Sequence, residues 1–476
     1  MAETVARSTP LSPEDLSFWY ADQPRQRTTM AMLLELDRPP HRERLRAAAA
    51  RAVEAVPRLA ERVVDQPFDL ALPRWEPDPT FDLDFHIRSY SLDAAAKGED
   101  PARALFRTLG PIYERPFDRT RPLWEMIQLD RPDGGSALFF RLHHAVADGV
   151  GGNAILAALT DAAPDVAAPP YEAKGPGSWP PEGPAGELRK AVERRFEEAT
   201  GRWRAVTGAA VDAALKPRNL VHAWEIVQSF REDTALRSTS PLVDFGRARR
   251  LGGFDVPFEP LREAKRRLGG KMIDLLLTAA ADAAGSWHRA AGYSDVEQLI
   301  VLAPVNLRPA EDLGLGAGLG NRTTGLMMPL PIGPMDPRER FQLVRRRVEE
   351  RKSHPSVTAF PKLAAAMAAL PRPLYRYLAF QAAREVDLIV TNVPGVMQPR
   401  YIAGAKIRAA YPFAPVTAHC PVSIALYGYR GRLYVGLDAD ATAMPDLESF
   451  EGMLAASLGA LVEAAGVGRN QQPPLL

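Results

Sequence analysis

The spacing of apolar and polar residues predicts a chain that mixes helices and strands along its whole length. Short apolar runs and one alternating run are typical of strands, whereas apolar residues three or four apart indicate amphipathic helices. Strands are expected at residues 30–36, 81–87, 122–129, 136–142, 298–304, 386–391, 421–427 and 432–437. One helix is expected to start within residues 11–19. Further helices are expected to span residues 41–56, 154–163, 187–215, 272–284 and 338–352.

Two of these strands, 122–129 and 136–142, are separated by Arg131-Pro132-Asp133-Gly134-Gly135. This composition is a strong turn signal, so the two strands are predicted to form an antiparallel hairpin. The second strand leads directly into His143 and His144.

A proline-rich stretch divides the pattern. Residues 164–184 contain seven prolines and three glycines, a composition typical of a linker or an extended crossover. The predicted organisation is therefore an N-terminal domain at 1–163, a linker at 164–186 and a C-terminal domain at 187–476.

Composition excludes several classes of protein. Lys and Arg total 59 against 58 Asp and Glu, a balance that does not favour nucleic-acid binding. Cys420 is the only cysteine, so neither an internal disulfide nor a cysteine zinc site is expected. No apolar run reaches 18 residues, and Met1–Pro10 lacks the pattern of a signal peptide. We expect a cytoplasmic protein that is soluble or at most peripheral to a membrane.

The segment Arg141–Gly149 carries the clearest chemical signal, with the sequence RLHHAVADG. Histidine exchanges protons near neutral pH, and the carboxylate of Asp148 follows His144 by four residues. Gly149 suits a tight turn that a side chain would block. The structural alternative is a pair of buried histidines at a strand end. A zinc site is less favoured, since adjacent strand residues point to opposite faces and no third ligand is evident.

This motif resembles that of the acyltransferase superfamily of chloramphenicol acetyltransferase and peptide-synthetase condensation domains. Within it, the chain most resembles the bacterial wax ester synthase/diacylglycerol acyltransferase family. Further segments carry that resemblance across about residues 11–440: Leu11-Ser12-Pro13-Glu14-Asp15, Pro122-Leu123-Trp124, Gly320-Asn321 with Pro329-Leu330-Pro331, and Thr391-Asn392-Val393-Pro394-Gly395.

The resemblance implies an α/β fold of two chloramphenicol acetyltransferase-like domains. Each is a mixed sheet covered by helices, and the active site lies in a channel between them. It implies an O-acyltransferase in which His144 is the general base, His143 supports it and Asp148 orients the loop. Acyl-CoA is then a co-substrate, a diacylglycerol or fatty alcohol accepts the acyl group, and neither a bound cofactor nor a metal is needed. Peripheral association with a membrane or lipid droplet fits such substrates.

Several other residues are candidates for substrate binding or structural support, namely Gly149, Pro122, Leu123, Trp124, Asn306, Arg308 and Asn392. Each also has a structural interpretation. Trp124 can anchor a strand in the core, and Val393-Pro394-Gly395 suits a type II turn to which Asn392 bonds. Arg308 is in a position to pair with Asp148 if the chain folds back.

One departure from the family pattern leaves alternatives open. The family usually carries Asn-Asp at the start of the helix near Met272, but here Ile273 precedes Asp274. An acyltransferase that uses a carrier-bound or specialised acceptor is one alternative. An inactive lipid-binding homologue is another, and the intact His144, Asp148 and Gly149 argue against it.

Overall fold

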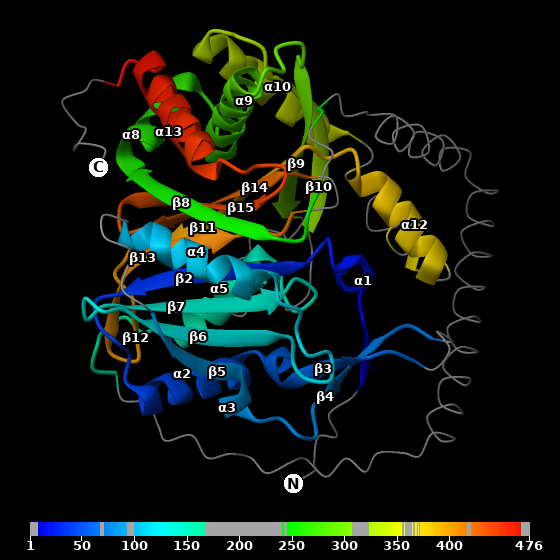
Figure 1. Cartoon of the computed structure of the whole chain (residues 1–476), viewed down its shortest axis with the longest axis vertical. Coiled ribbons are helices and arrows are strands. Elements are labelled where there is room, and N and C mark those ends of the chain that lie inside the picture. The colour runs from blue at the N-terminus through cyan, green and yellow to red at the C-terminus, as the bar shows by residue number, and fades with distance from the viewer. Residues whose placement is uncertain are drawn as a thin grey trace.

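The computed structural model describes residues 8–66, 71–92, 100–166, 240–241, 245–306, 323–354, 372–416 and 420–467, together with 357, 364, 367–368 and 370. Helices and strands alternate along the chain (Figure 1). The helices are α1 (Pro13–Ala21), α2 (Arg42–Ala55), α3 (Leu83–His86), α4 (Pro101–Glu114), α5 (Gly149–Leu159), α8 (Phe258–Leu268), α9 (Met272–Ala290), α10 (Pro337–Ser353), α12 (Arg372–Ala383) and α13 (Leu447–Ala464), with the 3-10 turn η1 (Pro57–Ala60).

The described strands form two six-stranded sheets and one small sheet. The first sheet has the order β12-β13-β2-β7-β6-β5, the second β10-β9-β11-β14-β15-β8, and the third β1-β4-β3. Their bounds are β1 (Thr9–Pro10), β2 (Thr29–Leu36), β3 (Glu61–Val64), β4 (Arg74–Pro77), β5 (Ile87–Ser91), β6 (Trp124–Asp130), β7 (Ser136–His143), β8 (Arg249–Pro257), β9 (Gln298–Asn306), β10 (Thr323–Pro331), β11 (Leu388–Val396), β12 (Tyr401–Ile402), β13 (Ala405–Phe413), β14 (Val422–Tyr429) and β15 (Arg432–Asp440).

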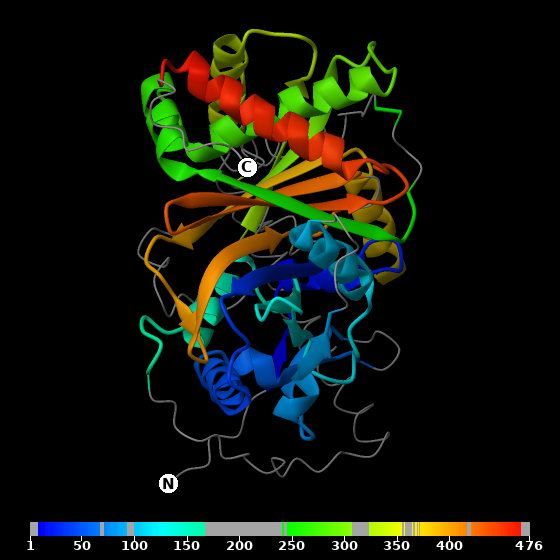
Figure 2. The same cartoon turned by 60° about the vertical axis from the view of Figure 1, so that its left-hand side comes forward.

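Both large sheets are mixed, as expected. In the first sheet only β5 and β6 run parallel. In the second, β11 runs parallel to both β9 and β14, and the other three strand pairs, β10–β9, β14–β15 and β15–β8, are antiparallel. Each sheet has its own buried apolar core. Figure 2 shows the two sheets stacked, with α8, α9, α10 and α13 on the side of the second sheet that faces away from the first.

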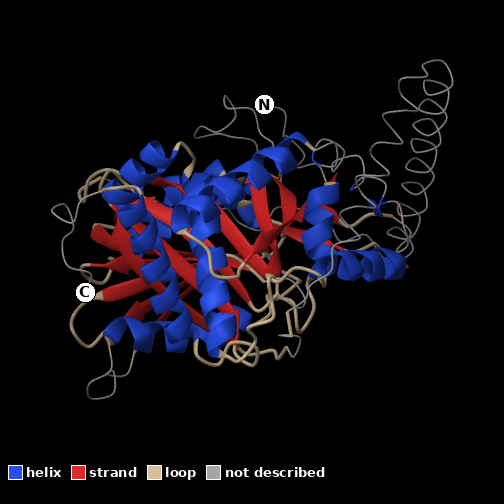
Figure 3. Ribbon diagram, turned by 90° about the horizontal axis from the view of Figure 1, so that it is seen from above, coloured by secondary structure: helices blue, strands red, loops and turns tan. Residues whose placement is uncertain are grey.

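The two sheets approach closely where β13 crosses β15. A side chain at Gly436 in β15 would place its Cβ 1.7 Å from the carbonyl oxygen of Pro412 in β13, so only glycine allows this contact. The hydroxyl of Tyr434 donates to the carbonyl of Arg408 across the same junction at 3.1 Å. Seen from above in Figure 3, the strands form the interior and the helices lie around them.

The proposed domain boundaries stay a prediction, because most of the linker lies outside the described residues, as does the helix expected at 187–215. The segment 401–413 comes late in the chain, yet its strand β13 pairs with β2 of the first sheet, and β12 pairs with β13 at the edge of that sheet. The first sheet is thus completed by a part of the sequence assigned to the C-terminal domain.

Among the described residues most predicted elements are present, and one predicted strand is not. The hairpin of β6 and β7 is antiparallel as predicted, and Ser12 caps α1 by accepting from the N–H of Asp15 at 3.0 Å. The strand expected at 81–87 is wrong, since Leu83–His86 forms a helical turn and β5 follows it. Among the described helices, none is both long and apolar enough to cross a bilayer.

Candidate active site

The two adjacent histidines lie where the hairpin ends. His143 is the last residue of β7, and its N–H donates to the carbonyl of Leu123 at 2.9 Å. Leu123 immediately precedes β6, in which Trp124 pairs with Leu142. The Pro122-Leu123-Trp124 motif and the histidines are therefore neighbours, although about twenty residues separate them in sequence.

Trp124 is a core residue, as its structural interpretation predicts. Its side chain is buried, its indole N–H donates to the carbonyl of Leu59 at 2.7 Å, and its ring stacks on His86. Pro122 and Leu123 are buried beside it. These three residues support the strand that presents His143.

His143 is enclosed, and both of its ring nitrogens are engaged. Nδ1 accepts from the N–H of Ala145 at 3.1 Å, so in the neutral ring Nε2 carries the proton and donates to Oγ1 of Thr28 at 2.9 Å. Burial lowers the pKa of His143 to about 4, although Asp22, 3.9 Å from Nε2, partly opposes this shift. A ring that is buried, neutral and hydrogen-bonded at both nitrogens suits a supporting role better than proton transfer.

His144 has a different environment. Its side chain is half-buried, and its ring stacks on Phe18 with 3.9 Å between the ring centroids and 15° between the planes. Its N–H donates to the carbonyl of Thr28 at 2.7 Å. Thr28 therefore holds the ring of one histidine and the backbone of the next. Of the two imidazoles, that of His144 is the one within reach of solvent.

Asp148 caps the helix that follows. Its Oδ1 accepts from the N–H groups of Val150 and Gly151 at 3.1 and 2.9 Å, and its side chain is buried. An N-terminal cap of this kind satisfies donors that would otherwise lack partners. Asp148 therefore fixes the start of α5 directly after the segment that carries the two histidines.

Gly149 lies at a close contact between α5 and β11 and does not form the predicted turn. It is the first residue of α5 and does not have a positive φ angle. A Cβ at this position would lie 3.3 Å from Cγ2 of Val393 in β11, a tight contact. Next to it, Nδ2 of Asn153 donates to the carbonyl of Pro394 at 2.6 Å. The start of α5 therefore packs against the second sheet.

The type II turn predicted at 393–395 is wrong, because these residues continue β11. Pairing with β14 carries the strand to Val396, and the register shifts between Val393 and Val396. The backbone of Asn392 is consequently paired with Leu426 of β14, and its exposed side chain makes no hydrogen bond to the described residues.

The structure does not bring all predicted site residues together. Asn306 ends β9, and only its backbone is described, while Arg308 and its expected pairing with Asp148 lie outside the described residues. Ile273, at the position of the family asparagine, packs against the second core. Asp274 is buried and accepts from the N–H of Lys271 at 2.7 Å.

Sequence reasoning missed three residues of this region, namely Phe18, Thr28 and Asn153. Each is far in sequence from its partner, so no local spacing links it to the histidines. The position of Phe18, three residues after the opening motif Leu11–Asp15, is the single usable signal.

A buried charge pair lies behind His143. Arg141 is fully buried, and its Nε and Nη2 donate to Oε2 of Glu125 at 3.0 and 2.7 Å. Burial opposes ionisation of Glu125, but the combined attraction of Arg141, Arg115 and Arg88 outweighs it and lowers the pKa of that carboxyl. Within the part of the chain that is described, no group of three or more His, Cys, Asp and Glu side chains is placed to hold a metal ion.

Comparisons with known proteins agree with this arrangement. Residues 11–276 match the wax ester synthase/diacylglycerol acyltransferase catalytic domain, and residues 319–461 match the C-terminal domain of the same family. Two relatives from Mycobacterium tuberculosis bear the name diacylglycerol O-acyltransferase. One is 28% identical and covers 98% of this chain and 94% of the relative. The other is 25% identical and covers 92% of each.

Solved structures share the fold at low identity. A wax ester synthase/diacylglycerol acyltransferase from Marinobacter aquaeolei aligns with a TM-score of 0.60 and 18% identity over 96% of this chain and all of that one. The first condensation domain of the calcium-dependent antibiotic synthetase aligns with a TM-score of 0.62 and 17% identity over 99% of both chains.

Proposed function

Because the chain belongs to the wax ester synthase/diacylglycerol acyltransferase family, a family of O-acyltransferases, we propose that it esterifies diacylglycerol or a long-chain fatty alcohol with an acyl group from acyl-CoA. The products are triacylglycerol or wax ester. The observation that carries the proposal is the difference in environment between the two histidines. His143 is buried and hydrogen-bonded at both ring nitrogens, whereas His144, which follows the end of the strand, is half-buried.

His144 acts as the general base. The hydroxyl oxygen of the acceptor attacks the thioester carbon while His144 removes the hydroxyl proton. The tetrahedral intermediate then loses CoA as its carbon–sulfur bond breaks, and the thiolate takes the proton back from His144. The imidazole ends the cycle neutral, and no covalent acyl-enzyme is formed.

The neighbouring residues keep that base in place. Phe18 restricts the ring of His144 by stacking, and Thr28 holds the backbone of His144 and the ring of His143. Asp148 orders the loop through the cap of α5 and does not touch the substrate. Orientation of this kind lowers the entropic cost of bringing base and acceptor together.

The two substrates meet at the junction of the two sheets, where the start of α5 faces β11. Acyl-CoA is a co-substrate, and no bound cofactor takes part in the transfer. The acceptor is a lipid, which favours peripheral association of the protein with a membrane or lipid droplet.

The test is an assay of free CoA thiol with palmitoyl-CoA and either hexadecanol or dipalmitoylglycerol. Release that requires an acceptor and falls to background in His144→Ala supports the proposal, and the faster acceptor identifies the physiological class. His144→Gln is the matched variant, since it keeps a polar side chain but cannot accept a proton near neutral pH. Release that is unchanged in both variants would exclude His144 as the base.

A further inference from the structure

The segment 25–29, which leads into β2, touches both histidines. The hydroxyl of Thr28 accepts from Nε2 of His143 at 2.9 Å and donates to the carbonyl of Phe18 at 3.3 Å. The carbonyl of Thr28 accepts from the N–H of His144 at 2.7 Å. Because Phe18 in turn stacks on His144, the placement of both imidazoles depends on where Thr28 lies. Whatever fixes the segment 25–29 therefore orients the proposed base.

The first group that fixes this segment is the hydroxyl of Tyr113, near the end of α4. Among the described strands, the pairing of β13 with β2 stops at Ala31, so strand pairing on that side does not reach Thr29. The hydroxyl of Tyr113 donates to the carbonyl of Thr29 at 2.5 Å, and the side chain of Tyr113 is buried. A buried backbone carbonyl needs a donor of this kind. Burial also raises the pKa of Tyr113 well above its usual range, so the hydroxyl keeps its proton.

The second group is the guanidinium of Arg249, the first residue of β8, and it belongs to the other large sheet. Its Nη2 donates to the carbonyl of Arg25 at 2.9 Å, and its backbone N–H donates to Oε2 of Glu114 in α4 at 3.2 Å. Its Nη1 lies 3.6 Å from Oδ2 of Asp440 in β15, and both side chains are buried. The side chain of Arg249 therefore reaches from an ion pair in the second sheet to the segment that holds the histidines.

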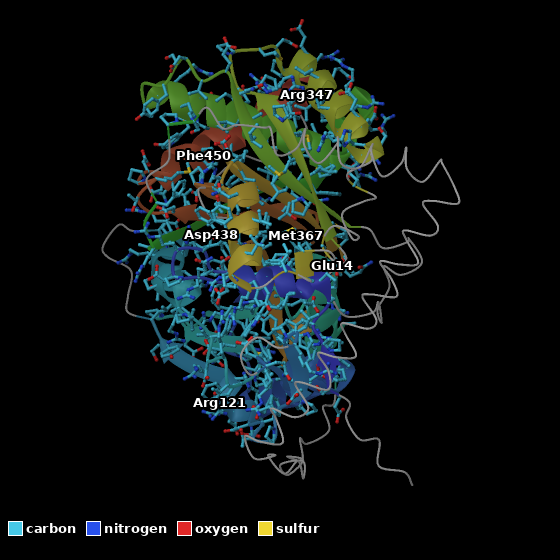
Figure 4. All side chains as sticks on the ribbon, turned by 90° about the vertical axis from the view of Figure 1, so that its right-hand side faces the viewer. Glu14, Arg121, Arg347, Met367, Asp438 and Phe450 are labelled. Carbon is cyan, nitrogen blue, oxygen red and sulfur yellow. The ribbon has the colours of Figure 1, made fainter. Side chains whose placement is uncertain are left out.

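Two buried carboxyl groups of β15 hold these two residues from the second sheet. Oδ1 of Asp440 accepts from three backbone N–H groups at 2.8–3.1 Å, which fixes the ion-pair partner of Arg249. Asp438 lies beside the hydroxyl of Tyr113. Figure 4 labels Asp438 at the level where the second sheet, above, meets the blue and cyan elements of the first, below.

The two contacts hold Thr28 from both sides along the chain. The carbonyl that Arg249 binds belongs to Arg25, three residues before Thr28, and the carbonyl that Tyr113 binds belongs to the residue directly after it. Two such anchors leave the segment little freedom to shift. A shift of about 1 Å in a catalytic group can lower a rate by about a hundredfold.

We propose that Tyr113 and Arg249 are positioning residues for the acyl transfer, which hold Thr28, and through it the two histidines, against the second sheet. This role rests on the proposed function, in which His144 is the base. It adds that the base is correctly oriented only when the two sheets are packed together. Both residues act through Thr28 and need no contact with a substrate.

The first experiment compares Tyr113→Phe with the matched control Tyr434→Phe in the full chain. Each variant removes one buried hydroxyl that donates to a backbone carbonyl, that of Thr29 in the first case and that of Arg408 at the sheet junction in the second. We expect Tyr113→Phe to lower kcat for thiol release about tenfold while the KM for palmitoyl-CoA changes less than about twofold. Tyr434→Phe should keep kcat within about twofold, although urea titrations should show a similar loss of stability.

Arg249→Lys tests the second anchor without removing the charge. The variant keeps a cation beside Asp440, but an ammonium group lacks the two-sided fork that also reaches the carbonyl of Arg25. We expect the same pattern as for Tyr113→Phe, a lower kcat with an almost unchanged KM. A kcat equal to that of the unmodified chain in both Tyr113→Phe and Arg249→Lys would overturn the inference.

A readout that needs no catalysis separates this inference from the proposed function. With isotope-labelled histidine rings, the Nε2 proton of His143 should exchange with solvent at least about tenfold faster in Tyr113→Phe than in Tyr434→Phe, because Thr28 is no longer held. Lack of transfer by the unmodified chain would count against the proposed function, and the exchange rate would still decide whether Tyr113 holds His143. Normal transfer and normal exchange in Tyr113→Phe would count against the positioning role alone.

Discussion

The imidazole of His144 stacks on the phenyl ring of Phe18, with 3.9 Å between the ring centroids. Phe18 belongs to α1, whose first turn is capped by Ser12. A helix near the start of the chain thus sets the orientation of a histidine that follows the seventh strand. The contact restricts rotation of the ring and leaves it half-buried.

Replacing Phe18 tests this contact. We expect Phe18→Leu to lower kcat about tenfold while the KM for palmitoyl-CoA changes less than about twofold, because the base is less well oriented but the donor site is intact. Phe18→Tyr keeps the ring and should retain most of the activity. Equal losses in the two variants, measured by thiol release, would contradict an orienting role.

Asp148 gives a prediction that separates ordering from chemistry. Asp148→Ala removes the acceptor for two N–H groups and should cost about 1–2 kcal/mol of unfolding free energy, together with most of the activity. Asp148→Asn retains a capping oxygen, so its stability in urea and its activity should stay close to those of the unmodified chain. Inactive but stable Asp148→Asn would instead indicate that the negative charge takes part in catalysis.

The buried His143 makes stability depend on acid. Its pKa is about 4 in the folded protein and about 6.5 when exposed, so between these values the unfolded chain binds a proton that the folded chain does not. The unfolding free energy should therefore fall as the pH drops from 6.5 to 4, by up to about 3 kcal/mol. His143→Asn should flatten this slope in urea titrations, whereas replacement of the exposed His41 should leave it in place.

Asp438 acts in the opposite sense. Burial raises the pKa of this carboxyl to about 6, although Arg249 opposes the shift. Here the folded state keeps the proton, so stability is full below the ordinary pKa near 4 and falls as the pH rises to 6, by up to about 3 kcal/mol. The stability of Asp438→Asn relative to the unmodified chain should therefore improve between pH 4.5 and pH 7.5. A constant difference would mean that the carboxyl ionises normally.

The contact between the sheets is tested at Gly436. Gly436→Ala places a Cβ against the backbone carbonyl of Pro412, which cannot move aside as a flexible side chain would. We expect a loss of about 3 kcal/mol or more in unfolding free energy. Gly459→Ala in α13, where nothing lies within 4 Å of the added carbon, should stabilise the protein slightly through helix propensity. Similar effects at the two positions would disprove close packing at the junction.

Local pattern predicted what depends on neighbours in sequence. The hairpin that ends at His143 follows from two apolar runs and a glycine turn, and the start of α1 follows from Ser12 and Pro13. The error at 81–87 is also local. Alternation fits a strand there, but Asp82 caps a helical turn, and Phe81 and Phe85 both pack against His86.

Tertiary structure decided the rest. The sequence by itself determined the mixed α/β class, the family and the histidine segment, because these depend on residue type and short spacing. Only the fold placed Phe18 on His144 and Gly149 against Val393. It also carried β13 from the C-terminal part of the chain into the first sheet. Such contacts join segments whose separation along the chain leaves no periodic signal, and they arise only when the apolar faces of two sheets are buried together.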